Sequence, residues 1–143
     1  MPTSTRFVVS IHLLTALAYN DGKPLASDVI AGSASTNAAV VRRLFSQLAE
    51  AGLVGALLGQ GGGFVLAKPP EEITLLQIFR AVEDPELFPG PRSPPSENCL
   101  IGRHILGALE APLGRVERAF AAELARITLA DIVADVRDRI ALV

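Results

Sequence analysis

The sequence has little of what several protein classes require. Its 143 residues include a single cysteine, Cys99, which excludes an intramolecular disulfide framework. Aromatic residues make up only 5%, so the core must be aliphatic. No segment approaches the ~20 consecutive apolar residues of a membrane span, and a net charge of −2 argues against a general polyanion binder. Half of the residues are hydrophobic, which is enough for the core of one compact domain. Because a membrane span and a disulfide framework are both missing, we expect a soluble, cytoplasmic protein.

Charge is unevenly distributed along the chain. Residues 1–70 carry five basic and three acidic residues, whereas residues 71–143 carry eight basic and twelve acidic ones. A mildly basic front half and an acidic back half suit a DNA reader joined to a different kind of module. The basic excess is small, so we expect modest affinity for phosphates unless the chain dimerises.

The apolar segment near the N-terminus has two interpretations. Arg6 precedes an apolar run over residues 7–18, and the small residues at its end resemble the cleavage site of a secretory signal. The same run places its apolar side chains on one face of a helix. We favour an amphipathic helix over residues 5–19, in which His12 is a structural residue rather than a metal ligand.

A helix-turn-helix pattern follows this first helix. A turn at residues 20–24 leads to a short helix over residues 25–31, with Val29 and Ile30 available for the core. A second turn then leads to a recognition helix over residues 37–51, with Thr36 as its expected N-cap. The apolar positions of that helix and its end predict one buried side: Val40, Val41, Leu44, Leu48 and Leu53.

A glycine-tipped β-hairpin is expected directly after the recognition helix. Gly52 ends the helix, and two short apolar runs, 53–58 and 64–67, are joined by a segment that holds four glycines and Gln60. A helix followed by a small hairpin is the core of a winged helix, so the fold class is mainly α with one small hairpin. Such a helix enters the DNA major groove, while the wing reaches the backbone or the minor groove.

The second half of the chain predicts further helices around a proline-rich loop. Thr74 opens a helix over residues 75–83 with a capping-box pattern, and residues 84–98 then hold five of the ten prolines. A long helix follows, which Pro112 should kink or split, and Thr128 caps a final helix that reaches residue 140. The apolar stripe of the long helix comprises Ile101, Ile105, Leu109, Leu113, Val116, Phe120, Leu124 and Ile127.

This stripe bears on the assembly of the protein. It can fold back on its own domain or pair with the same helix of another chain, and we favour pairing. A two-fold dimer places two recognition helices about 34 Å apart, at successive major-groove faces. We therefore expect a winged helix-turn-helix domain over residues 1–83, a loop over 84–98 and dimerisation helices over 99–143.

Four short motifs carry a resemblance to a known family. The runs AGLV at 51–54, GGG at 61–63, AKP at 67–69 and ITL at 73–75 resemble, in order and spacing, the IscR/NsrR/CymR family of bacterial regulators. The similarity covers nearly the whole chain. It implies a homodimeric winged-helix transcription factor of a kind that usually represses and binds palindromic operators. The TNAAVVRR segment and the single-cysteine loop resemble the YwnA-type subgroup.

The sequence departs from the family pattern at two places. Relatives that bind an iron–sulfur cluster carry three cysteines before the long helix, whereas this chain has only Cys99, with His104 as no more than a second ligand. A [2Fe–2S] cluster usually takes four protein ligands, so we expect no cluster and no other cofactor. Relatives also often carry an arginine in the wing, where this chain has residues 57–60, and Gln60 is left as the candidate for a minor-groove hydrogen bond.

The candidate DNA-binding residues gather around the recognition helix. Asn37 can reach a phosphate or adenine, and Arg42 can bond guanine in a bidentate manner. The alternative is a solvated face on which Arg43 pairs with Glu50 or with an acidic group elsewhere, with the serines of the turn making local backbone bonds. The full set is Ser35, Thr36, Asn37, Arg42, Arg43, Gln60 and Lys68.

Cys99 is the remaining candidate functional residue. Its place at the start of the long helix lowers the pKa of a thiol, which suits a redox sensor or an intersubunit disulfide; the alternative is a small hydrophobe packed at a helix start. We see no nucleophile–base pair and no metal-ligand cluster, so we expect no enzyme. The sequence predicts a homodimeric, DNA-binding transcriptional repressor of unknown effector; the alternatives are a protein-interaction module and a thiol-based redox-sensing repressor.

Overall fold

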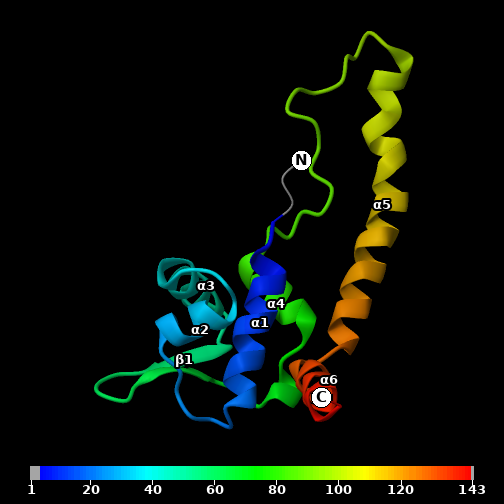
Figure 1. The fold of residues 1–143 in the computed structure, drawn as a ribbon. Coiled ribbons are helices and arrows are strands. Elements are labelled where there is room, and N and C mark those ends of the chain that lie inside the picture. Colours follow the sequence, from blue (N-terminus) through cyan, green and yellow to red (C-terminus); the bar gives the residue numbers. More distant parts are fainter. Residues whose placement is uncertain (1–3, 143) are drawn as a thin grey trace.

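The computed structural model describes residues 4–142, which form six α-helices, one 3-10 helix and a two-stranded hairpin (Figure 1). The elements are α1 (Arg6–Tyr19), α2 (Ser27–Ser33), α3 (Ala38–Glu50), β1 (Val54–Leu57), β2 (Gly63–Leu66), the 3-10 helix η1 (Pro70–Glu72), α4 (Leu75–Val82), α5 (Leu100–Arg126) and α6 (Leu129–Ala141). The prediction of a mainly helical fold with one hairpin and a long C-terminal helix is confirmed. No helix among the described residues is long and apolar enough to cross a membrane.

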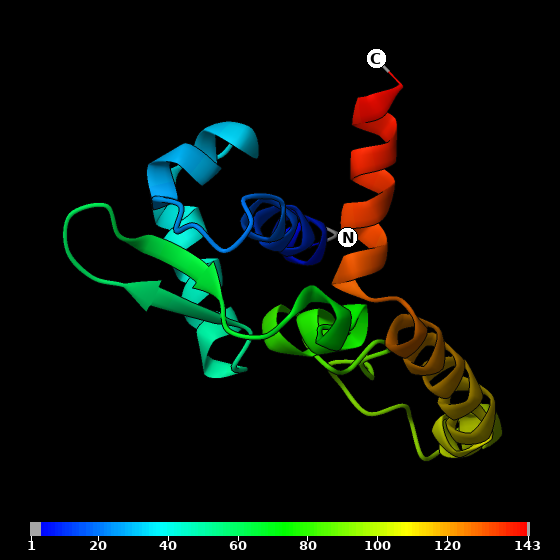
Figure 2. The same cartoon turned by 90° about the horizontal axis from the view of Figure 1, so that it is seen from below.

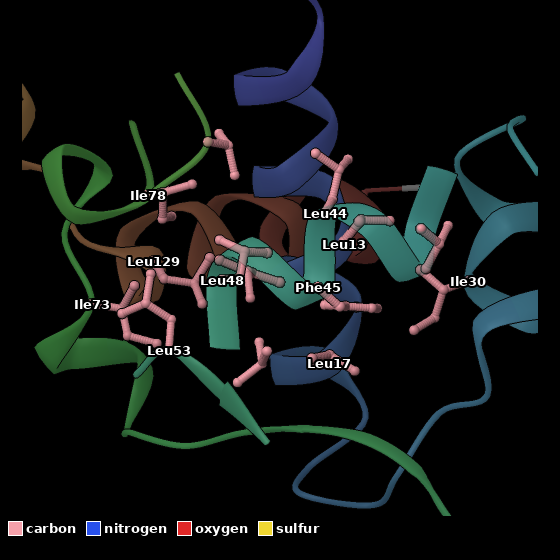
Figure 3. Close-up of a cluster of buried hydrophobic side chains, with 14 of the residues drawn as sticks. Leu13, Leu17, Ile30, Leu44, Phe45, Leu48, Leu53, Ile73, Ile78 and Leu129 are labelled. Carbon is pink, nitrogen blue, oxygen red and sulfur yellow. The ribbon is translucent and has the colours of Figure 1, made fainter. Parts of the chain in front are cut away.

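The core is mostly aliphatic and lies between α1, α3 and α4, with further residues from α2 and α6 (Figure 3). From α1 it takes Leu13, Leu14 and Leu17, which are at most 2% exposed, as the amphipathic interpretation of this segment requires. From α3 it takes the predicted apolar stripe, except that Val40 is only half-buried. Phe45, absent from the predicted stripe, is fully buried at its centre.

The short helix α2 begins and ends two residues later than the sequence predicts. Leu25 is not helical but pairs with Phe64 of β2: Leu25 N–H donates to the Phe64 carbonyl at 3.1 Å, and Phe64 N–H donates back at 2.8 Å. The extended backbone at Leu25 thus satisfies the edge of the hairpin, and α2 begins only afterwards. Ile30 is buried as expected, whereas Val29 is 59% exposed and does not belong to the core.

The hairpin is short, and its tip depends on glycine. The two strands pair in antiparallel register from Val54 opposite Leu66 to Leu57 opposite Gly63. Gly61 has φ +78°, and a Cβ at Gly62 would lie 2.1 Å from the Leu57 carbonyl oxygen. A residue with a side chain at position 62 would therefore collide with the end of β1.

Backbone hydrogen bonds hold the start of α6 beside the start of α4, where each helix also has a capping box. Thr74 and Thr128 each cap their helix with a reciprocal side-chain bond, and the two residues form an isolated antiparallel bridge. Leu129 N–H donates to the Ile73 carbonyl at 2.8 Å, and the Leu129 side chain is fully buried. The start of α6 therefore packs into the N-terminal unit, while the division of the chain at residues 83 and 98 stays a prediction.

Helix α5 is one continuous element of 27 residues that extends away from the other helices (Figure 1). The expectation that Pro112 can split it was wrong: Pro112 lies inside the helix. Because α5 has no buried residue, water can bond the carbonyl that a proline leaves without its helical partner. The segment between α4 and α5 forms no helix or strand, as its prolines predicted.

The apolar stripe of α5 divides between two environments. Near its end, Phe120 packs edge-to-face against Phe79 of α4, with ring centroids 5.1 Å apart, and Leu124 contacts the core. Near its start, Ile101 is 73% exposed and Ile105 is 36% exposed. The end of the stripe therefore folds back on its own chain, whereas its start is uncovered.

Candidate nucleic-acid interface

The recognition helix begins one residue later than predicted. Asn37, rather than Thr36, is the N-cap of α3: its side-chain oxygen accepts the Val40 N–H at 3.0 Å. Thr36 still belongs to the turn, where its own N–H donates to the Ala31 carbonyl at 2.9 Å. The carboxamide oxygen of Asn37 is thus engaged within the helix, and its NH₂ group is what remains to meet a phosphate or a base.

The turn before α3 is tightly specified. Ser35 is exposed and has φ +54°, a left-handed conformation that few residues with a side chain adopt. Two residues earlier, at the end of α2, the Ser33 hydroxyl meets Nε2 of His12 at 2.9 Å, so His12 is hydrogen-bonded to a serine, as expected of a structural histidine. The His12–Ser33 contact ties the end of α2 to α1, directly before the turn that leads to α3.

The solvent face of α3 carries the two predicted arginines. Arg42 and Arg43 are both exposed, while Val41 and Leu44 beside them are buried. Arg42 Nη1 lies 3.5 Å from the Ser27 hydroxyl of α2. Within residues 4–142 neither arginine makes an ion pair, so the alternative pairing of Arg43 with Glu50 is not formed. Both charges face solvent.

Two further residues share this face, and their residue types alone did not mark them as candidates. Ala39 and Ser46 are exposed, three residues before and four residues after Arg42, which places all three on one side of the helix. A methyl group can contact the thymine methyl, and a hydroxyl can bond either kind of base edge. Helical spacing from Arg42 was the signal that would have identified them.

The hairpin is fixed to the recognition helix by two aromatic rings. Phe45 of α3 and Phe64 of β2 stack with ring centroids 4.3 Å apart and an angle of 24° between their planes. The hairpin projects from the body beside α2 and α3 (Figure 2). Gln60 is exposed at its tip, whereas Lys68 is half-buried after the end of β2 and lines a pocket together with residues of α1 and α6, so neither candidate lies with the α3 residues.

Cys99 lies far from this face, at the first end of α5 (Figure 1). It is exposed, so its interpretation as a packed hydrophobe was wrong. The backbone N–H groups of Gly102 and Ile101, at the start of α5, lower the pKa of the Cys99 thiol below its ordinary value.

The donor residues do not fit an iron–sulfur cluster. Among residues 4–142, no three His, Cys, Asp or Glu side chains are placed to hold a metal ion. Cys99 is the sole cysteine of the chain, and His104 adds one nitrogen about one turn further along α5. A cluster needs about four such ligands.

Comparison with known proteins adds independent information. The family model Rrf2, described as an iron-dependent transcriptional regulator, matches residues 3–135. The HTH-type transcriptional regulator YwnA of Bacillus subtilis (strain 168) is 34% identical over 129 residues, which cover 90% of this chain and 95% of YwnA.

Solved structures agree in fold. CymR (YrzC) of B. subtilis, described as the global cysteine regulator, is 26% identical, with a TM-score of 0.68 over 94% of this chain and 97% of CymR. T. potens IscR has a TM-score of 0.71 at 24% identity, over 95% of this chain and 88% of IscR. The similarity therefore extends over nearly the whole length of this chain.

Proposed function

Because the chain belongs to the Rrf2 family of transcriptional regulators, we propose that it is a homodimeric repressor of a palindromic operator in the bacterial cytoplasm. The chain is a winged helix-turn-helix regulator and not an enzyme, as predicted. The exposed face of α3 is the observation that carries DNA reading. Arg42 and Arg43 lie there without ion pairs among residues 4–142, beside the small residues Ala39 and Ser46.

The homodimer is supported by the uncovered start of α5. Its apolar residues would remain in water in a monomer, and contiguous exposed apolar surface of this kind marks association sites. The same helix in a second copy presents a matching surface, as a two-fold interface requires. The exposed apolar side chains are Leu100, Ile101, Ile105, Leu106, Leu109 and Val116.

The regulator works without an iron–sulfur cluster in this proposal. The single thiol of Cys99 supports this part of the proposal, because the described residues supply no set of metal ligands around it. Purified protein should show no absorption bands of a cluster after anaerobic reconstitution with iron and sulfide, and bands with stoichiometric iron would contradict the proposal.

DNA selection tests the proposed function. The purified chain is incubated with a random duplex library, and the bound sequences are amplified and read over several rounds. Enrichment of an inverted repeat, together with a complex mass of two chains per duplex, is the expected result. If no sequence is enriched, the winged helix serves as a protein-interaction module instead, an alternative that its uncharged wing favours.

A repressor that senses oxidants through a thiol is the second candidate. It is favoured by Cys99, which is exposed and whose pKa is lowered. Thiolates are the species that peroxides oxidise. Treatment with hydrogen peroxide should then change operator affinity in the native chain and leave it unchanged in Cys99→Ser. An equal response of the two proteins would exclude Cys99 as the sensor.

A further inference from the structure

The tip of the wing carries an exposed leucine. Leu58 is 95% exposed, and Leu57 before it is 52% exposed. No residue between positions 51 and 67 is charged, so the hairpin has no group that can attract a phosphate over a distance. An exposed apolar side chain is unremarkable on a flexible polar loop, but Leu58 lies at the tip of a hairpin that other residues hold in place.

Two contacts hold the hairpin in place. Phe64 of β2 stacks on Phe45 of α3, and its backbone bonds to Leu25 in both directions. The wing therefore moves with the recognition helix. Four residues of a β-strand span about 13 Å, which is close to the ~12 Å width of the major groove. A wing of this length can therefore extend past the major groove that α3 occupies, so that its tip reaches the neighbouring minor groove.

We propose that Leu58 is an apolar wedge that enters the minor groove of the operator and opens a base step, so that the protein bends the DNA that it reads. The proposal rests on the proposed DNA-binding function and adds the way in which the wing contributes. Apolar side chains inserted from the minor groove unstack a base step and kink the duplex toward the major groove.

The wedge also implies a class of operator sequence. Pyrimidine–purine steps, TA and CA/TG, are the most easily kinked. Such a step is expected in each half-site where the tip of the wing arrives, outside the bases that face α3. This preference arises from deformation of the duplex and needs no hydrogen bond from the wing.

The test uses the full-length chain and a duplex recovered by DNA selection. 2-Aminopurine at the expected step reports unstacking as a rise in fluorescence, and dyes at the two ends report bending by energy transfer. We expect both signals with the native chain and with Leu58→Met, and neither with Leu58→Ser. Burying a leucine contributes enough for Leu58→Ser to weaken binding by roughly ten- to a hundredfold.

Leu142→Ser is the matched control. Leu142 is 86% exposed and is the C-cap of α6, a helix that lies away from the hairpin (Figure 1). This variant should bind and bend the duplex as the native chain does. The wedge is excluded if Leu58→Ser keeps the native fluorescence rise and bend angle. If the native chain selects no sequence at all, the DNA-binding function itself fails; if it binds an unbent, fully stacked duplex, only the wedge fails.

Discussion

Phe45 in α3 and Phe64 in β2 stack with their ring centroids 4.3 Å apart, and this pair joins the recognition helix to the wing. Phe45 is fully buried, whereas Phe64 is half-buried. The backbone of Phe64 also bonds to Leu25, just before α2. Phe64 of the wing thus contacts both α3 and the segment just before α2, so the wing is tied to the helix-turn-helix.

Phe64→Ala should loosen this unit without abolishing the fold. A fully buried Phe→Ala change costs about 3–5 kcal/mol, so the half-buried Phe64 should cost about 2 kcal/mol of unfolding free energy. Urea denaturation followed by circular dichroism measures this. Phe64→Leu keeps much of the apolar contact and should lose less; equal stability of the native chain and Phe64→Ala would contradict the role of the stack.

Ile101→Glu with Ile105→Glu should prevent formation of the proposed dimer. Both side chains are exposed in the single chain, so the change costs little within it, but a dimer would bury four carboxylates without partners. Sedimentation equilibrium should give twice the chain mass for the native protein and the chain mass for the variant. The exposed Val29→Glu on α2 serves as a control and should leave the mass unchanged.

Thr128→Ala should remove the cap of α6 and lower the stability of the folded chain. The Thr128 hydroxyl accepts the Asp131 N–H at 3.2 Å, and the Asp131 carboxylate accepts the Thr128 N–H at 2.9 Å. Loss of such a cap costs about 1 kcal/mol. Thermal unfolding should show a lower Tm for Thr128→Ala and a nearly native Tm for Thr128→Ser, which keeps the hydroxyl. If both variants melt alike, the hydroxyl is not the stabilising group.

Cys99 should react faster in the folded chain than in the unfolded chain. The backbone N–H groups of Gly102 and Ile101 lower the pKa of its thiol in the folded state, and the thiolate is the nucleophile. As pH rises, the folded chain therefore forms thiolate first. Alkylation by iodoacetamide across a pH series, compared with the chain in urea, should show the folded curve displaced to lower pH. Coincident curves would contradict the assignment.

The sequence predicted the helices best where one face is buried. The spacing of Val41, Leu44 and Leu48 identified α3, and the glycines identified the hairpin, because both signals are local. The start of α2 was missed because Leu25 is held by Phe64, a partner 39 positions along the chain that no local pattern reveals. The cap was assigned to Thr36 instead of Asn37 because both residue types cap helices and only the turn geometry distinguishes them.

The candidate site was predicted in part. Charge identified Arg42 and Arg43, but the small residues Ala39 and Ser46 carry no charge, and only their helical spacing from Arg42 could have marked them before the structure showed that they are exposed. The exposure of Leu58 likewise depends on the tertiary structure, because an apolar residue in a strand-forming run is expected to be covered. The periodicity of the apolar stripe in α5 could not show which part of it is covered, because the spacing is the same in the covered and the exposed parts.

DNA reading by the face of α3 is the central claim, and a titration of Arg42→Ala with Arg43→Ala against the selected operator tests it most directly. Arg92→Ala with Arg126→Ala removes the same charge from exposed residues outside the winged helix and is the matched control. The account predicts that the α3 variant binds at least about tenfold more weakly. Its salt dependence should be shallower by about 0.9 in log–log slope for each DNA phosphate that the variant no longer neutralises. Native affinity and native salt slope in a folded α3 variant would contradict the account.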